Sequence, residues 1–289
     1  MEISVRTQLD ARAELGEGPC WDSESGRLYW VDINAGRSHA TEPAGGDDHV
    51  IEAGEKIGAA VLASSGAIIA AGERGFVEVA SGGGIARRIA DPEESNPDTR
   101  FNDGKCDPAG RFWAGSISLS RATGSAALYR LDPGGTVSKL VEGVTVSNGL
   151  AWDLGKSRMY YIDSPTKSVV AFDYSNDDGT ISNPLIAFAT GPDMGSPDGM
   201  TIDAEGMLWI AFYRGGCVAR WNPETGELLQ RVEIPAPHVT SCCFGGNELK
   251  TLFVTTARQG MDDAGLERFP EAGGLFAFEP GVEGTPSYR

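Results

Sequence analysis

Residues 195–212 of the chain read GSPDGMTIDAEGMLWIAF, and the rest of the sequence follows the pattern of this stretch. Asp198 stands between a proline and a glycine, a context that is typical of turns. An alternation of apolar and polar residues comes next, followed by a second turn and the apolar run 207–212. This order predicts a turn, a short strand, a hairpin and a second strand.

The same layout occurs six times along the chain. The first apolar residue of the second strand is Leu28, Ile68, Phe112, Met159, Leu208 and Leu252 in successive copies, which are therefore 40 to 49 residues apart. Four short antiparallel strands in about 45 residues are typical of a propeller blade. We therefore predict an all-β chain that forms a single six-bladed β-propeller domain over residues 1–289. Residues 3–9 precede the first copy and are expected to form the outer strand of the last blade, which closes the ring.

Composition and charge exclude several classes of function. Lys and Arg number 24 against 41 Asp and Glu, a net charge of −17, so the surface repels nucleic-acid phosphates and we expect no nucleic-acid partner. No apolar run approaches the roughly 18 residues of a membrane span, and the N-terminus lacks the pattern of a signal peptide. The five cysteines lack a disulfide spacing, so we expect reduced thiols in a cytoplasmic protein. The sequence leaves the oligomeric state open.

Aligned on the glycine of the first turn, the six copies define one equivalent position, which is expected to lie at one end of a central channel. We call its occupants the slot residues: Glu17, Ile57, Asp103, Asn148, Asp198 and Ser241, with Asn102 next to the third. Carboxylates crowded at one end of a channel need a counter-charge, so we predict one bound divalent cation. Oxygen ligands favour calcium, with magnesium, manganese or zinc as alternatives.

Several motifs at these positions carry a family resemblance. They are Leu15-Gly16-Glu17-Gly18-Pro19, Arg100-Phe101-Asn102-Asp103-Gly104-Lys105, Ser147-Asn148-Gly149-Leu150 and Pro197-Asp198-Gly199. Through them the chain resembles the regucalcin (senescence marker protein) and gluconolactonase family from about Glu14 to Tyr288. The resemblance implies a six-bladed propeller that hydrolyses sugar lactones. It also implies that Glu17, Asn148 and Asp198 bind the metal, and that Arg100, Asn102 and Asp103 hold the hydroxyl groups of the substrate.

One loop departs from that family pattern. Regucalcin-like members carry glutamates that approach the substrate in the loop after the third copy, whereas residues 117–123 here read ISLSRAT. The polar contacts of this loop are therefore different, and the identity of the substrate does not transfer. Arg100 itself has an alternative interpretation as a surface residue that pairs with Asp98 or Glu94.

The expected reaction is metal-assisted attack of water on the lactone carbonyl. Asp198 is expected to serve both as a metal ligand and as the base that orients or deprotonates the water, with Asp103 as the second candidate. Two other functions stay open, a hydrolase of organophosphates or aryl esters and a calcium-binding regulatory propeller without turnover. Asp203 lies in the outward turn of the same blade, and the change Asp203→Asn is expected to leave turnover nearly unchanged.

Overall fold

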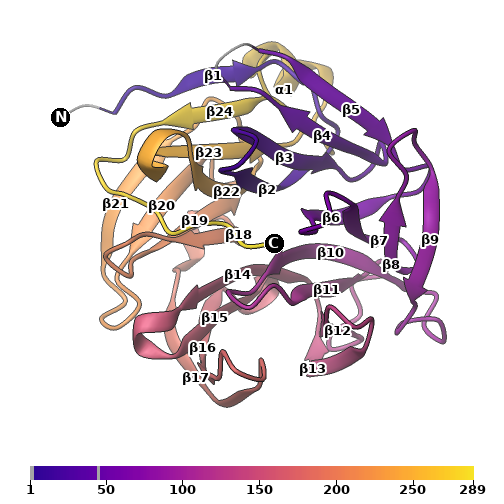
Figure 1. The fold of residues 1–289 in the computed structure, drawn as a ribbon. Coiled ribbons are helices and arrows are strands. Elements are labelled where there is room, and N and C mark those ends of the chain that lie inside the picture. Colours follow the sequence, from indigo (N-terminus) through magenta and orange to yellow (C-terminus); the bar gives the residue numbers. More distant parts are fainter. Residues whose placement is uncertain (1–2, 44–45) are drawn as a thin grey trace.

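The computed structural model describes residues 3–43 and 46–289, so Met1, Glu2 and residues 44–45 lie outside the description. Within the described residues the chain forms six four-stranded antiparallel sheets, arranged as blades around a ring (Figure 1). The predicted six-bladed β-propeller is confirmed. Each blade is built from consecutive strands, because the short turns between them favour hairpins.

The first three blades follow one another along the chain. Blade 1 consists of β2 (Gly16–Asp22), β3 (Arg27–Asp32), β4 (Arg37–Thr41) and β5 (Asp48–Glu52). Blade 2 consists of β6 (Ile57–Leu62), β7 (Ile68–Gly72), β8 (Gly75–Val79) and β9 (Ile85–Ala90). Blade 3 consists of β10 (Thr99–Cys106), β11 (Phe112–Ser118), β12 (Ala126–Leu131) and β13 (Val137–Val144).

The last three blades complete the ring. Blade 4 consists of β14 (Ser147–Asp153), β15 (Arg158–Asp163), β16 (Ser168–Tyr174) and β17 (Ile181–Ala189). Blade 5 consists of β18 (Ser196–Ile202), β19 (Leu208–Tyr213), β20 (Cys217–Trp221) and β21 (Leu228–Glu233). Blade 6 consists of β22 (Val239–Gly245), β23 (Thr251–Thr256), β24 (Leu275–Phe278) and β1 (Arg6–Leu9).

The N-terminal strand β1 closes the ring. It pairs antiparallel with β24, with Arg6 opposite Ala277, and so forms the outer edge of blade 6 as the sequence predicts. The helix α1 (Asp263–Arg268) lies in the connection between β23 and β24. Short 3-10 turns occur at Leu154–Lys156, Ser164–Thr166, Pro192–Met194 and Asn247–Leu249. No helix in the described part of the chain is long and apolar enough to cross a membrane.

The hydrophobic core lies between the blades. Each of six apolar clusters joins two neighbouring blades; Trp30 of blade 1, for example, shares a cluster with Phe253 and Leu275 of blade 6. Strands such as β11 are therefore buried along their whole length. This packing holds the innermost strands, β2, β6, β10, β14, β18 and β22, side by side around the channel.

The two ends of the channel differ. The end where the innermost strands begin, which we call the site end, carries the slot residues. At the opposite end, the far end, the C-terminal segment runs through the middle of the ring (Figure 1). Its Thr285 hydroxyl donates to the Ile202 carbonyl at 3.1 Å, and Arg289 pairs with Asp22 and Glu24. The terminal segment therefore covers the far end.

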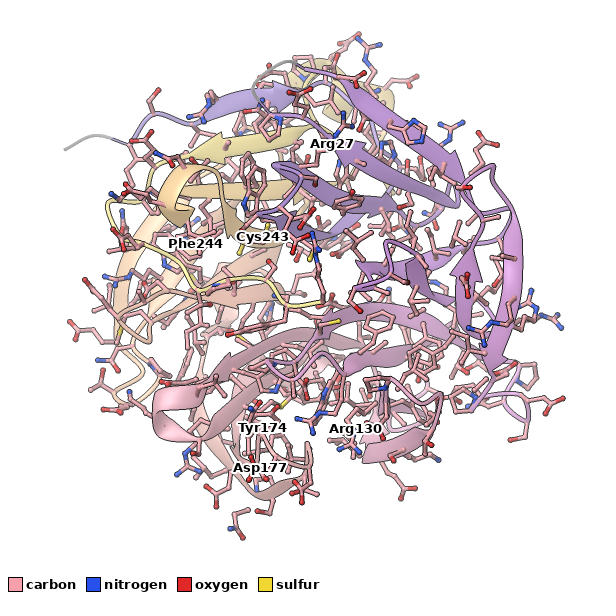
Figure 2. The ribbon with its side chains drawn as sticks, viewed as in Figure 1. Arg27, Arg130, Tyr174, Asp177, Cys243 and Phe244 are labelled. Carbon is pink, nitrogen blue, oxygen red and sulfur yellow. The ribbon has the colours of Figure 1, made fainter. Side chains whose placement is uncertain are left out.

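The innermost strands of blades 3 and 5 lead into buried aspartates at the far end. Asp107 follows β10, and its Oδ2 accepts hydrogen bonds from Arg111, from the Trp113 indole and from Tyr174 of blade 4. Of these residues, Tyr174 is labelled in Figure 2. Asp203 follows β18 and is bonded in the same way. Its Oδ2 accepts from the Trp209 indole at 3.0 Å and from Arg220 at 2.8 Å.

Asp203 therefore does not have the environment that the sequence suggests. It is only 1% exposed, although we expected a residue of an outward turn. Its Oδ1 accepts from two backbone amides of the turn, so both carboxylate oxygens are satisfied. Asp203→Asn should therefore lower stability, because removal of the charge leaves Arg220 with a weaker partner, whereas its small effect on turnover stays a prediction.

The described cysteines are all unpaired, as expected. Four are buried, whereas Cys20 is half-buried. Cys242 and Cys243 are neighbours on β22 but belong to different apolar clusters, because adjacent strand residues point to opposite faces. They cannot bind one metal ion together.

Candidate active site

The slot residues lie within the innermost strands, not in turns before them as the sequence suggests. Each innermost strand has a break in its pairing register near its first residues: between Glu17 and Cys20, Ile57 and Ala59, Phe101 and Gly104, Asn148 and Leu150, Pro197 and Met200, and Val239 and Ser241. Such bulges re-aim side chains and are frequent beside active sites. The turn-like sequences therefore encode bulges in strands.

The glycines that follow the slot residues allow the innermost strands to approach closely. A Cβ on Gly58 would lie 2.5 Å from the Phe101 carbonyl oxygen of the next blade, and a Cβ on Gly149 would lie 2.8 Å from that of Asp198. Both distances are shorter than any real Cβ contact. These glycines keep the ring narrow at the site end, and this brings the slot residues of separate blades together.

A cavity of about 560 Å3 opens at the site end. Its polar lining includes five of the residues that we expected in the site: Glu17, Arg100, Asn102, Asn148 and Asp198. Asp103 and Ser241 do not line it. Asp103 is buried and its Oδ1 accepts a 2.7 Å hydrogen bond from the Gly104 amide, while burial, its largest influence, raises the pKa of this carboxyl.

Asp198 is the most unusual polar group in the cavity. The carboxylate is 7% exposed, and its Oδ1 has no hydrogen-bond partner among the described residues. Burial raises the pKa of Asp198 well above its ordinary value, and the nearby charge of Asp103 raises it further. A buried carboxylate oxygen without a partner is costly, so this atom is available for a ligand.

Glu17 faces the same space under similar conditions. Its Oε2 accepts a hydrogen bond from the Gly18 amide at 3.0 Å. Burial raises the pKa of Glu17 well above its usual value, and the charges of Asp198 and Asp103 add to this effect. Mutual repulsion between these groups shows that they share one low-dielectric region.

The amide of Asn148 is held in a fixed orientation. Its Oδ1 accepts from Asn102 at 3.0 Å and its Nδ2 donates to the Ser164 hydroxyl at 2.7 Å. Ser164 donates in turn to the Pro197 carbonyl at 2.6 Å, next to Asp198. A carbonyl oxygen can accept two hydrogen bonds, so Asn148 Oδ1 keeps one lone pair for a ligand.

Arg100 is a cavity residue, not a surface residue. It is 8% exposed, and its Nη1 donates to the Phe101 carbonyl at 2.6 Å and to Asn102 at 3.2 Å. Burial lowers the pKa of Arg100 to about 10, while the charge of Glu17 opposes this shift. The alternative pairing with Asp98 does not occur, because Asp98 binds the hydroxyls of Ser118 and Ser120 instead.

These side chains suit a hard divalent cation. Glu17, Asn148 and Asp198 offer two carboxylates and one oriented amide oxygen, and the partnerless Asp198 Oδ1 is the kind of atom that a cation satisfies. Across residues 3–43 and 46–289, no group of three or more His, Cys, Asp and Glu side chains is arranged to bind a metal. The predicted set differs from such groups because one of its three members is an asparagine.

Other polar residues of the lining were not identified from the sequence: Ser164, Ser196, Tyr213, Arg214 and Gln259. Arg121 also lines the cavity and lies in the loop 117–123 that departs from the family pattern. Arg121 belongs to the loop after β11, and Arg214 to the turn between β19 and β20. The sequence did contain a signal that Arg214 would lie near the site. In an antiparallel hairpin, the end of the second strand lies beside the start of the first, so residues after β19 must lie near Asp198.

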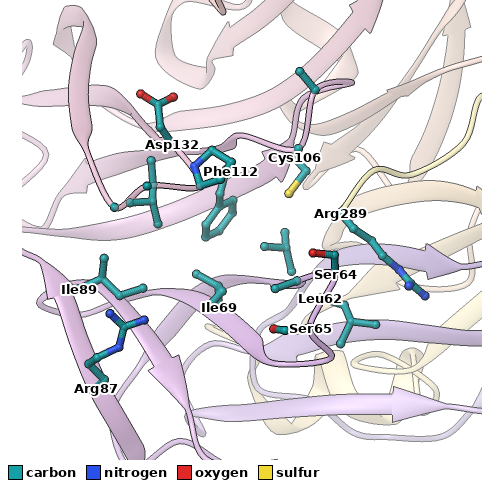
Figure 3. Close-up of a pocket in the computed structure, with 18 residues that line it drawn as sticks. Leu62, Ser64, Ser65, Ile69, Arg87, Ile89, Cys106, Phe112, Asp132 and Arg289 are labelled. Carbon is teal, nitrogen blue, oxygen red and sulfur yellow. The ribbon is translucent and has the colours of Figure 1, made fainter.

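A second cavity, of about 510 Å3, lies between blades 2 and 3 (Figure 3). Ile69, Ile89 and Phe112 supply an apolar wall, and Arg289 lies at its edge. The cavity is on the far end of the ring and contains none of the slot residues. We therefore place the candidate active site in the cavity at the site end.

Comparisons with known proteins identify the family to which the chain is similar. The model of the SMP-30/gluconolactonase/LRE-like region matches residues 15–258. YvrE of Bacillus subtilis (strain 168), which carries the name sugar lactone lactonase, is 40% identical over 270 residues, covering 93% of this chain and 92% of that protein. Regucalcin of Danio rerio is 40% identical over 293 residues, covering 99% and 98%. A solved structure described as a calcium-binding regucalcin from Agrobacterium tumefaciens str. C58 is 26% identical, covers 99% of this chain and 98% of that one, and has a TM-score of 0.92.

Proposed function

The chain belongs to the SMP-30/gluconolactonase/LRE-like family, and from this premise we propose that it is a lactonase that opens sugar lactones with the help of one divalent cation. The observation that carries the proposal is the buried Asp198 Oδ1, which has no partner among the described residues and lines a cavity together with Glu17 and Asn148. The names of the relatives support the substrate class. The name of the Agrobacterium relative supports calcium as the cation.

Glu17, Asn148 and Asp198 would hold the cation. When bound, a divalent cation supplies a Lewis acid for the lactone carbonyl and lowers the pKa of coordinated water. The carboxylate of Asp198 takes the proton of the attacking water on the oxygen that does not hold the cation, as the oxygen of that water bonds to the carbonyl carbon. The bond between the carbonyl carbon and the ring oxygen then breaks, and the departing ring oxygen receives the proton that Asp198 had taken, which regenerates the carboxylate. Asp103 is a weaker candidate for this base, because it does not line the cavity.

Arg100 and Asn102 have donors suited to sugar hydroxyls. The guanidinium of Arg100 uses Nη1 for its contacts to Phe101 and Asn102. Its remaining N–H groups are available to bind a substrate. Asn102 also orients Asn148 through its Nδ2, so it links the substrate-binding side of the cavity to the proposed cation site.

The proposal is tested by assays of gluconolactone hydrolysis with the protein as purified, after exhaustive chelation, and after restoration of calcium, magnesium, manganese or zinc. We expect chelation to abolish turnover and one of the cations to restore it, with a parallel loss and recovery of melting temperature. Full activity in the chelated protein would contradict the role of the cation. Turnover of aryl esters or organophosphates without turnover of lactones would identify the second kind of hydrolase, and calcium binding without any turnover would identify a regulatory protein.

A further inference from the structure

Three arginines line the cavity at the site end. Arg100 is buried in its wall, whereas Arg121 and Arg214 are exposed at its mouth. The two exposed arginines come from blades that are not neighbours, because Arg121 follows β11 of blade 3 and Arg214 follows β19 of blade 5. On a chain with a net charge of −17, this concentration of positive charge at the entrance of one cavity is unexpected.

Arg121 and Arg214 form no salt bridge among the described residues. Burial and the charge of Asp103 raise the pKa of Asp198, and the charge of Arg121 lowers it against these larger effects. Arg220, a few residues further along blade 5, pairs with both Asp203 and Glu205. By contrast, neither Arg121 nor Arg214 forms a salt bridge or a side-chain hydrogen bond with any other described residue. Arg214 lies over the ring of Tyr213, 5.9 Å from its centroid, a position that leaves its N–H groups unused.

The backbone presents both residues in an uncommon conformation. Arg121 and Arg214 each have a φ of 61°, in the left-handed region that non-glycine residues seldom adopt. The loop that contains Arg121 is held in place because Asp98 accepts hydrogen bonds from the hydroxyls of Ser118 and Ser120. The Arg121 amide donates to the Ser118 carbonyl at 3.1 Å. Arg121 is therefore displayed by an ordered loop.

The charges of Arg121 and Arg214 influence the pKa values of other side chains that line the active-site cavity. Burial is the largest influence on the pKa of Arg100, and the positive charge of Arg121 lowers this pKa further. Burial raises the pKa of Tyr213, and the charges of Arg214 and Arg121 both oppose that shift. The charges of the two arginines, which come from different blades, therefore act on one side chain of the cavity lining.

We infer that Arg121 and Arg214 form an anion subsite, so that the preferred substrate is a sugar lactone with a negatively charged group remote from the carbonyl. The group is a carboxylate or a phosphate ester, since the planar fork of an arginine binds either of them. This inference rests on the proposed function and names the substrate class of that same site. In the proposed function Glu17 and Asp198 would bind the cation, so Arg121 and Arg214 would remain available to pair with a charged group of the substrate.

The size of the cavity is consistent with such a substrate. A volume of about 560 Å3 lies in the usual range for small-molecule sites and exceeds what one sugar ring needs. With the lactone carbonyl at Asp198, the remote end of the molecule points to the mouth. A neutral hydroxymethyl group there would leave two arginines unpaired, whereas an anionic group would bind them both.

The experiment compares three lactones of the same sugar: gluconolactone, which is neutral, glucarolactone, which carries a carboxylate, and phosphogluconolactone, which carries a phosphate. The variants are Arg121→Gln, Arg214→Gln and the double variant. Arg74→Gln is the matched control, since Arg74 occupies the equivalent turn between β7 and β8 of blade 2, is exposed, and does not line the cavity. Melting temperatures show whether each variant folds.

We expect the wild-type protein and Arg74→Gln to prefer one of the charged lactones by about tenfold or more in kcat/KM, a preference that weakens at high salt. The preference should disappear in the double variant, mainly through KM of the charged lactone. The charged lactone that is preferred identifies the carboxylate or the phosphate. A wild-type preference for gluconolactone, or a charged-lactone preference that survives in the folded double variant, would overturn the inference.

A binding measurement separates this inference from the proposed function. Calorimetry with gluconate and glucarate, which differ by one carboxylate, needs no turnover. Tighter binding of glucarate that is lost in the double variant would support the subsite even if no lactone were hydrolysed, in which case only the proposed function fails. Equal binding of the two acids, together with turnover of gluconolactone alone, would overturn the subsite and leave the lactonase proposal intact.

Discussion

The innermost strand of blade 5 has a buried aspartate at its site end and another just beyond its far end, and the two are bonded very differently. Asp203 at the far end is 1% exposed, and both of its oxygens accept hydrogen bonds from the backbone, from Trp209 and from Arg220. Asp198 at the site end is 7% exposed, and its Oδ1 has no partner in the described part of the chain. The two residues are only five positions apart.

Hydrogen-bond satisfaction therefore distinguishes structural from functional carboxylates, whereas burial and residue type are alike in both. Asp107 repeats the pattern of Asp203 in blade 3, since it bonds Arg111, Trp113 and Tyr174. A satisfied aspartate stabilises the blades that it joins. An unsatisfied one costs stability and is retained for binding or chemistry, because a buried charge without a partner is destabilising.

The largest expected effect that tests this comparison is on activity. Asp198→Asn retains the shape of the side chain but removes the charge and the base, so kcat for gluconolactone should fall by about 100-fold or more, the usual scale for the loss of a general base. The melting temperature of the chelated variant should not fall, because the lost carboxylate had an unpaired oxygen. Steady-state kinetics and thermal unfolding measure both quantities. A strongly destabilised Asp198→Asn with unchanged kcat would show that Asp198 is structural.

The second test concerns stability at the far end. Asp203→Asn weakens the ion pair between buried Asp203 and partly buried Arg220 and should lower the free energy of unfolding by about 2 kcal/mol, the scale of a charged hydrogen bond. Activity per folded molecule should stay near the wild-type value, since Asp203 does not line the active-site cavity. Urea unfolding monitored by tryptophan fluorescence gives the stability. If Asp203→Asn and Asp198→Asn lose turnover equally, the division between the two ends is wrong.

The smallest expected effect is the pH dependence of the chelated protein. Burial is the main cause of the raised pKa values of Glu17 and Asp198, so the folded state binds their protons more tightly than the unfolded chain does. Their contribution to stability is therefore fully present below the unfolded-state pKa values of about 4 and is lost as the pH rises through the raised values.

The melting temperature of the chelated protein should therefore rise by a few degrees when the pH is lowered from above the raised pKa values of Glu17 and Asp198 to below them. The rise should be smaller in Asp198→Asn, which lacks one of the two carboxyls. It should also shrink when a divalent cation is added, because the cation competes with protons for the same oxygens. A rise of the same size in both proteins, with and without cation, would assign the pH dependence to other groups.

Local pattern predicted the fold well. The alternation of apolar residues with period two and the turn chemistry repeat in each copy, and both act within a few residues, so six blades and the closing strand β1 could be predicted. The equivalence of Glu17, Asn148 and Asp198 also followed from the repeat. The cavity contains all three, and their proposed role as cation ligands is a prediction that the chelation assay tests.

The sequence alone thus determined the number of blades, the closure of the ring and which residues are equivalent. Only the tertiary structure decided the environment of each position: the ion pair of Asp203 with Arg220, the exclusion of Asp103 from the cavity, and the presence of both Arg121 and Arg214 in the cavity lining. The physical reason is that a repeat specifies backbone placement through short-range forces. Hydrogen-bond satisfaction and electrostatic environment depend on side chains from other strands and blades, which the ring brings together only when it closes.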